Sequence, residues 1–168
     1  MTTAGEGPTD LPADVLAGQA IYNRVTLAAY DVGVLGLSCR LVWRCPKGDM
    51  LAGYNRNVGA SHLELGVGTA YFLDRCRFPA VRPQLTLVDL NPTVLTVAAR
   101  RIARYEPQTV RANVRKHLRV PANAFDSVGM NFLLHCVPGD WPAKAAVFAN
   151  AAAALRPGGR MFGSTILA

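Results

Sequence analysis

The sequence lacks a long hydrophobic run. No apolar stretch approaches the roughly 20 residues that a helix needs to cross a bilayer. The first ten residues are polar and contain no signal-peptide core. With 168 residues, of which 51% are hydrophobic, the chain has enough apolar surface for one domain with its own core. We therefore expect a globular, soluble protein that acts in the cytoplasm, with no membrane partner.

Cysteine pairs with a recognisable spacing are also absent. Cys39, Cys45, Cys76 and Cys136 form no Cys-x-x-Cys pair and have no metal-ligand spacing with the three histidines. We expect free, buried or partly buried thiols in preference to disulfides, and no metal site.

Aromatic residues are scarce around the basic ones. The formal net charge of +7 could indicate a nucleic-acid partner. The basic residues form two local clusters, which are Arg100, Arg101 and Arg104, and Arg111, Arg115, Lys116 and Arg119. Neither cluster contains the interleaved aromatic side chains on which single-stranded bases stack. We therefore expect no nucleic-acid partner, and we interpret the first cluster as a solvated helix face.

Three regions follow one another along the chain. Residues 1–11 are predicted to be a disordered tail, 12–58 an N-terminal helical cover, and 59–168 the core domain. In the core, strands are expected near 61–66, 84–89, 108–113, 126–132 and 160–167, and helices near 69–77, 92–105 and 141–155. This alternation predicts an α/β fold with a mostly parallel sheet flanked by helices.

Local signals support the predicted helix boundaries. Asn91 precedes Pro92 and can cap the helix that begins there, and Asp140 can cap the next helix. Gly158 and Gly159 are expected to stop that last helix after Leu155.

A glycine turn follows the first predicted strand. Residues 62–69 read His-Leu-Glu-Leu-Gly-Val-Gly-Thr, so an apolar run with the acid Glu64 turns through Gly66 and Gly68 into a helix. Glycine allows positive φ and close backbone approach, and a helix start offers free N–H groups to a ligand. A dinucleotide fingerprint requires a third small residue where this chain has Tyr71. The turn therefore favours a nucleotide-type ligand that has no pyrophosphate.

Other polar residues are expected to share the edge of the sheet with this turn. Asp89 lies 21 residues after Gly68 (89 − 68), the distance at which an acid accepts hydrogen bonds from a ribose diol. Asn113 and Asn131 end the next two predicted strands. Ligands of parallel sheets bind at the carboxyl ends of the strands, so these residues and Glu64 are predicted to bind the cofactor.

Four motifs in order make the chain similar to the class I S-adenosylmethionine-dependent methyltransferases. They are Glu64–Ala70, Leu87–Asn91, Phe125–Val128 and Leu155–Gly159, within a resemblance that covers roughly residues 60 to 165. The resemblance implies a Rossmann-like fold, with S-adenosylmethionine as cofactor and S-adenosylhomocysteine as product. It also implies that Gly66 and Gly68 contact the methionine part, that Asp89 holds the ribose hydroxyls, and that Asn113 lies near the adenine amine.

The chain departs from this family's pattern in three places. Ala70 stands where many members have a third glycine, and the stretch 114–119 is more basic than is usual. The sequence ends at Ala168 in the fifth predicted strand, without the last helix and closing strand pair of the full fold. We expect either a truncated chain or a partner, such as a second copy in a homodimer, that covers the exposed sheet edge.

Candidates for catalysis lie beyond the fourth predicted strand and in the N-terminal cover. His135 is the candidate general base, and the alternative is a histidine that only shapes its loop. Tyr22, Tyr30 and Tyr54 are candidates for lining an acceptor pocket, with ordinary packing as the alternative. The Asn-Pro-Pro-Tyr signature of family members that methylate nucleobase amino groups is absent.

The leading interpretation is a methyltransferase that acts on oxygen, nitrogen or carbon of a small molecule, with secondary metabolism as one setting. One alternative is an enzyme of the same fold that catalyses a cyclisation or rearrangement in natural-product biosynthesis. Another is a non-catalytic binding or partner module.

Overall fold

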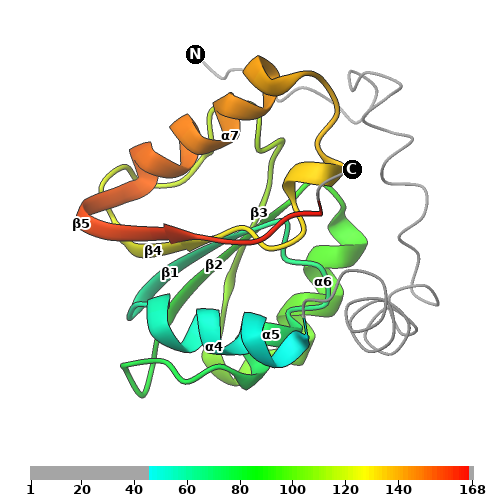
Figure 1. The fold of residues 1–168 in the computed structure, drawn as a ribbon. Helices are drawn as coiled ribbons and strands as arrows, with labels where there is room; N and C mark the ends of the chain where they lie inside the picture. The colour runs from blue at the N-terminus through cyan, green and yellow to red at the C-terminus, as the bar shows by residue number, and fades with distance from the viewer. Residues whose placement is uncertain (1–45, 167–168) are drawn as a thin grey trace, which may run out of the picture.

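The computed structural model describes residues 46–166 (Figure 1). Its helices are α4 (Lys47–Asn57), α5 (Tyr71–Arg75), α6 (Pro92–Arg101) and α7 (Trp141–Ala154), with short 3-10 turns η2 (Ala103–Tyr105) and η3 (Leu134–Cys136). Its strands are β1 (Ser61–Leu65), β2 (Gln84–Asp89), β3 (Gln108–Arg111), β4 (Phe125–Gly129) and β5 (Leu155–Phe162). The disordered tail predicted for 1–11 and most of the cover predicted for 12–58 lie outside the described residues.

The five strands form one parallel sheet in the order β3-β2-β1-β4-β5. The chain builds outward from β1 to β3 and then crosses back to place β4 on the other side of β1. In such sheets a ligand binds beyond the carboxyl ends of the strands where this reversal occurs. The predicted α/β fold with a parallel sheet is confirmed, and the reversal locates the site beside the ends of β1 and β4.

Helices cover both faces of the sheet. In Figure 1, α7 lies on one face, and α4, α5 and α6 lie on the other. Alternation along β1 directs Leu63 and Leu65 toward α7, where they share a buried cluster with Val147. His62 and Glu64 point to the opposite face, beneath α4. A polar pair is therefore buried on the face that carries α4 and α5.

Two predicted N-caps are confirmed. The Asn91 side chain accepts a hydrogen bond from the N–H of Thr93 at 2.9 Å, and Asp140 accepts one from the N–H of Ala143 at 3.0 Å. Each satisfies a backbone donor that the first helical turn leaves without a partner. The cap at Asn91 matters for the site because it fixes the start of α6 directly after Asp89.

The role predicted for Gly158 and Gly159 is wrong. The helix α7 ends at Ala154 and β5 begins at once, so both glycines lie inside the strand. The pairing of β5 with β4 shifts register between Phe125 and Ser127, and a Cβ on Gly159 would come within 3.1 Å of the carbonyl oxygen of Phe125. The glycines permit this irregularity in the strand, because only glycine tolerates such close backbone approach.

Other predicted boundaries need smaller corrections. The helix expected over 92–105 ends at Arg101 and is followed by η2. The third and fourth strands end at Arg111 and Gly129, so Asn113 and Asn131 lie in the loops that follow them. Among residues 46–166, none of the helices has the length and hydropathy to cross a membrane. Cys76 and Cys136 are free thiols, and the other two cysteines lie outside the described residues.

Candidate functional site

The glycine turn after β1 has an unusual backbone. Gly66 and Gly68 have φ values of +68° and +52°, in the left-handed region that favours glycine. A Cβ at Gly66 would lie 2.8 Å from Cδ1 of Leu133, so packing excludes a side chain there. A Cβ at Gly68 would meet no atom within 4 Å among the described residues. The described part of the chain therefore leaves the space beside Gly68 open, and a ligand can approach the backbone closely there.

Ala70 closes the turn in the same left-handed conformation, with a φ of +55°. It caps α5, and its N–H donates to the carbonyl oxygen of Val67 at 3.0 Å. The left-handed region costs a residue with a Cβ roughly 1–2 kcal/mol. The departure from the family's third glycine therefore leaves a strained residue in the turn.

Asp89 ends β2 on the same edge of the sheet. Its Oδ1 accepts a hydrogen bond from the N–H of Asn91 at 2.9 Å, and the residue is only partly exposed. Burial raises the pKa of Asp89 to about 6, against the opposing effect of backbone N–H groups from Asn91 and Leu90. The carboxylate is ionised above that pH and can accept hydrogen bonds from hydroxyl groups.

Glu64 has very different surroundings. Its side chain is 3% exposed, Oε1 accepts a hydrogen bond from the Tyr54 hydroxyl at 2.6 Å, and Oε2 lies 2.8 Å from Nε2 of His62. Both oxygens therefore bind protein groups below the glycine turn. A direct contact of Glu64 with the cofactor stays a prediction, and these bonds favour a positioning role for this residue.

The contacts of Glu64 continue into β4. Nδ1 of His62 lies 2.7 Å from Oγ of Ser127, and the same Oγ accepts the N–H of Gly59 at 2.8 Å. With Nε2 of His62 as the donor to Glu64 and Nδ1 as the acceptor from Ser127, the side chains of Glu64, His62 and Ser127 all have hydrogen-bond partners. A Cβ on Gly129 would come within 2.3 Å of Oε2 of Glu64, so the neighbouring strand must carry glycine there. The network joins α4, β1 and β4.

Tyr54 belongs to this core network. Its ring stacks on Phe72 and meets Phe162 edge-on, each with centroids 5.1 Å apart, and the residue is 2% exposed. Burial first, and then the carboxylate of Glu64, raise the pKa of Tyr54 well above its ordinary value, so its hydroxyl keeps its proton. The predicted place of Tyr54 in an acceptor pocket stays a prediction, and its described contacts are with core side chains and with Asn131 in the loop after β4. Tyr22 and Tyr30 lie outside the described residues.

The two predicted asparagines lie at the expected edge of the sheet. Oδ1 of Asn113 accepts the N–H of Arg115 at 3.0 Å, which fixes the turn after β3. Oδ1 of Asn131 accepts the hydroxyl of Ser164 at 2.7 Å. These oxygens therefore stabilise their own loops, and the contacts predicted with the cofactor stay predictions.

His135 lies on η3, beyond the end of β4, and is exposed. Its N–H donates to Oγ1 of Thr165 at 3.2 Å, and its Nδ1 is 3.4 Å from the same oxygen. Partial burial, followed by the charge of Lys144, lowers the pKa of His135 below its ordinary value. The imidazole is therefore neutral at neutral pH and can accept a proton.

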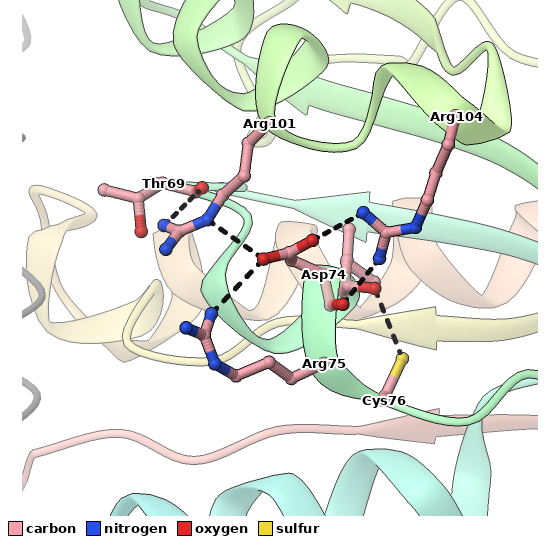
Figure 2. Close-up of polar contacts among 7 residues, drawn as sticks. Thr69, Asp74, Arg75, Cys76, Arg101 and Arg104 are labelled. Carbon is pink, nitrogen blue, oxygen red and sulfur yellow. Dashed lines mark hydrogen bonds and ion pairs between the residues drawn. The ribbon is translucent and has the colours of Figure 1, made fainter.

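The predicted solvent exposure of the first basic cluster is confirmed for Arg100 and Arg104, whereas Arg101 is partly buried. Arg101 and Arg104 reach from the end of α6 and from η2 to Asp74 on α5 (Figure 2). The spacing of three residues predicts that Arg101 and Arg104 lie on the same side of a helix. It gives no sign of their partner Asp74, which is about 30 residues away in the sequence. Only the packing of α5 against α6 brings these residues together.

Comparisons with known proteins agree with this architecture. A family model described as a methyltransferase domain matches residues 63–161. The chain is 45% identical over 169 residues to demethylluteothin O-methyltransferase of Streptomyces thioluteus, covering 99% of this chain and 74% of that protein. It is 41% identical over 152 residues to the physcion biosynthesis cluster O-methyltransferase of Aspergillus chevalieri, covering 89% and 68%. The solved DhpI–SAH complex has a TM-score of 0.64 at 19% identity, covering 91% of this chain and 70% of that one, which shows a shared fold.

The parallel sheet, the glycine turn and these matches define a class I S-adenosylmethionine-dependent methyltransferase domain. The chain belongs to this methyltransferase family and is a methyltransferase.

Proposed function

We propose that the chain transfers a methyl group from S-adenosylmethionine to a hydroxyl oxygen of a small secondary metabolite. The observation that carries the proposal is the 45% identity, over nearly the whole chain, to a protein named as the O-methyltransferase of demethylluteothin. The second relative is also named as an O-methyltransferase of a biosynthesis cluster.

The residues at the sheet edge fit this cofactor. The open space beside Gly68 would admit the methionine part close to the backbone, and the partly exposed carboxylate of Asp89 would accept the two ribose hydroxyls. Asn113 and Asn131 would line the same edge. The cofactor supplies an electrophilic methyl group on a sulfonium, so the protein has to position the acceptor and remove its proton.

His135 is the residue we assign to proton removal. The lowered pKa of His135 keeps its imidazole ring neutral at neutral pH, and the contacts with Thr165 hold the ring beyond the end of β4. A neutral imidazole beside the acceptor would take the hydroxyl proton as the oxygen attacks.

Incubation with methyl-labelled S-adenosylmethionine and a panel of hydroxylated natural products tests the proposal. A product that carries the label on oxygen supports it. An acceptor that is cyclised or rearranged without gaining the label would favour the alternative enzyme of the same fold. Cofactor binding without turnover of any acceptor would favour a non-catalytic binding module.

We also propose that the edge strand β5 is covered in a homodimer. Among the described strands β5 pairs with β4 alone, which leaves one row of its backbone groups open to a partner. Met161 and Phe162 in β5 and Ile166 just after it are partly buried, so part of their apolar surface is still exposed. Trp141 and Phe148 on the neighbouring helix α7 are 69% and 41% exposed, and they add apolar area for a second copy.

Light scattering over a dilution series tests the dimer. A concentration-dependent dimer supports it, and a well-folded monomer at all concentrations contradicts it.

We also propose that the protein is located in the cytoplasm. Microscopy of the tagged protein in its own cells would test this location.

A further inference from the structure

Four charged side chains meet where α5 packs against α6 and η2 (Figure 2). Asp74 is the centre: its Oδ1 lies 2.6 Å from a guanidinium nitrogen of Arg104, and its Oδ2 lies 3.3 Å from Arg75 and 3.5 Å from Nε of Arg101. Partial burial disfavours the ionised carboxyl, but the three guanidiniums outweigh it and hold the pKa of Asp74 below its usual value. The cluster is therefore fully charged at neutral pH.

Arg101 makes a contact that sets it apart in this cluster. A terminal nitrogen of its guanidinium donates to the main-chain carbonyl oxygen of Thr69 at 3.1 Å, while its Nε faces Asp74. Its side chain is 25% exposed, against 46% for Arg104. One guanidinium thus bridges the glycine turn and helix α5, as Figure 2 shows.

Thr69 occupies the most constrained part of the turn. It is 5% exposed and lies between Gly68 and Ala70, both of which have positive φ. Because the left-handed backbone conformation is unfavourable for Ala70, the turn needs a contact from outside it to keep its peptide planes in place. A charge-assisted hydrogen bond to the Thr69 carbonyl is such a contact.

Helix α6 connects this contact to the other half of the site. Its first residues follow Asp89, whose carboxylate accepts the N–H of the capping residue Asn91, and its last residue is Arg101. A helix of ten residues is about 15 Å long and rigid over that length. The acid and the glycine turn are already neighbours at the carboxyl ends of the paired strands β1 and β2, where the N–H of Gly66 donates to the carbonyl oxygen of Val88 at 2.8 Å, and α6 leads from Asp89 back to Arg101.

We infer that Arg101 is a positioning residue for the cofactor: it holds the Thr69–Ala70 end of the glycine turn in place through the Thr69 carbonyl, while the pairing of β1 with β2 holds the other end beside Asp89. The inference rests on the proposed binding of S-adenosylmethionine at this turn. Without the guanidinium the turn would relax from its left-handed conformations, and its backbone would no longer match the ligand. Arg101 would then act on affinity for the cofactor more than on the stability of the domain.

The chain offers a matched control. Arg104 also binds Asp74, and its guanidinium lies 4.4 Å from the ring centroid of Tyr105, but its described contacts do not include the turn. Arg104→Ala therefore removes an ion pair of the same cluster and leaves the Thr69 contact in place. Arg101→Lys keeps the charge and one donor for the carbonyl, so it should restore part of what Arg101→Ala loses.

Calorimetric titration of S-adenosylhomocysteine, together with thermal melting, tests the inference on the full chain. Arg101→Ala is expected to weaken binding about tenfold, Arg101→Lys less than that, and Arg104→Ala less than about twofold, with similar melting temperatures for the two alanine variants. Equal losses of affinity in Arg101→Ala and Arg104→Ala, or no loss in either, would overturn it. If Arg101→Ala does not fold, Arg101→Met replaces it, because methionine keeps the aliphatic bulk and has no donor for the Thr69 carbonyl, and a normal affinity in folded Arg101→Met would overturn the inference.

Asp89→Ala, measured in the same series, separates this inference from the proposed function. If Asp89→Ala binds the ligand as tightly as the unaltered chain, the proposed cofactor site is wrong. If Asp89→Ala loses affinity and Arg101→Ala does not, the site stands and only the role of Arg101 fails.

Discussion

Glu64 and Asp89 lie on neighbouring strands near the same edge of the sheet, and their surroundings are opposite. Glu64 is buried, and both of its oxygens bind protein groups, Tyr54 and His62. Asp89 is partly exposed and accepts a backbone N–H from Asn91 in its own loop. An acid whose bonds hold three elements together serves the fold, whereas an acid that remains accessible at a strand end can serve a ligand. Substitutions of these two acids and of residues near them, and changes of pH, test this difference in role.

The largest effect is expected from Glu64→Ala on stability. The substitution leaves the Tyr54 hydroxyl and the His62 ring without their acceptor inside the core. A buried polar group left without its partner costs roughly 1–3 kcal/mol of unfolding free energy, so the two groups together should cost roughly 2–6 kcal/mol. Urea denaturation measures the loss, with Asp49→Ala as a control because that acid is exposed in the first turn of α4. A loss below about 1 kcal/mol would show that the network is dispensable.

His135→Ala is expected to act on turnover. If His135 is the base, the rate should fall about a hundredfold while affinity for the cofactor stays nearly unchanged. Single-turnover kinetics with a saturating acceptor measures the rate, and calorimetry measures the affinity. A parallel fall in affinity or melting temperature would instead show that His135 shapes the loop through Thr165. Full activity of the variant would remove both roles.

A smaller effect is expected from pH on the affinity for S-adenosylhomocysteine. The raised pKa of Asp89, about 6, means that its carboxylate is protonated below that pH and loses an acceptor for the ribose hydroxyls. Affinity should be constant above about pH 7 and fall roughly tenfold by pH 5, since one pH unit below the pKa leaves about a tenth of the group ionised. Asp89→Asn, which cannot titrate, should show weaker binding and no such fall. An equal pH dependence in both proteins would assign it to another group.

The burial of Asp89 also makes the stability of the ligand-free protein depend on pH, and the raised pKa sets the direction of that dependence. The pKa of Asp89 is higher in the folded state than its ordinary value of 3.8, so the folded state binds more protons between the two values. The contribution of this group to stability should therefore decrease as pH rises from about 4 to about 6. Comparing melting temperatures of the unaltered chain and Asp89→Asn across this range measures it.

The features that the sequence could predict are those with local signals. The glycine turn, the second acid and the caps at Asn91 and Asp140 each depend on residues a few positions apart, and all lie where expected. The parallel direction of the strands follows from the alternation of strands and helices. These patterns reflect backbone geometry and helix-end hydrogen bonds, which neighbouring residues largely determine.

The features that the sequence could not predict depend on packing between distant segments. The pattern around Glu64 gives no sign that Tyr54 and His62 will occupy both of its oxygens. Arg101 looks like one of several exposed arginines until α6 packs against the glycine turn, 32 residues away. The glycines at 158 and 159 look like a helix stop, and only the register shift against β4 places them in a strand.

We propose that Asp89 binds the cofactor and that Glu64 supports the fold. The most direct test is calorimetric titration of S-adenosylhomocysteine into the unaltered chain, Asp89→Ala and Glu64→Gln, each checked for folding at the titration temperature. Asp89→Ala is expected to lose about 1.5–3 kcal/mol of binding free energy, the range for lost hydrogen bonds to a charged group, while folded Glu64→Gln loses less than about 1 kcal/mol. Equal affinity of Asp89→Ala and the unaltered chain, or a larger loss in folded Glu64→Gln, would contradict the claim.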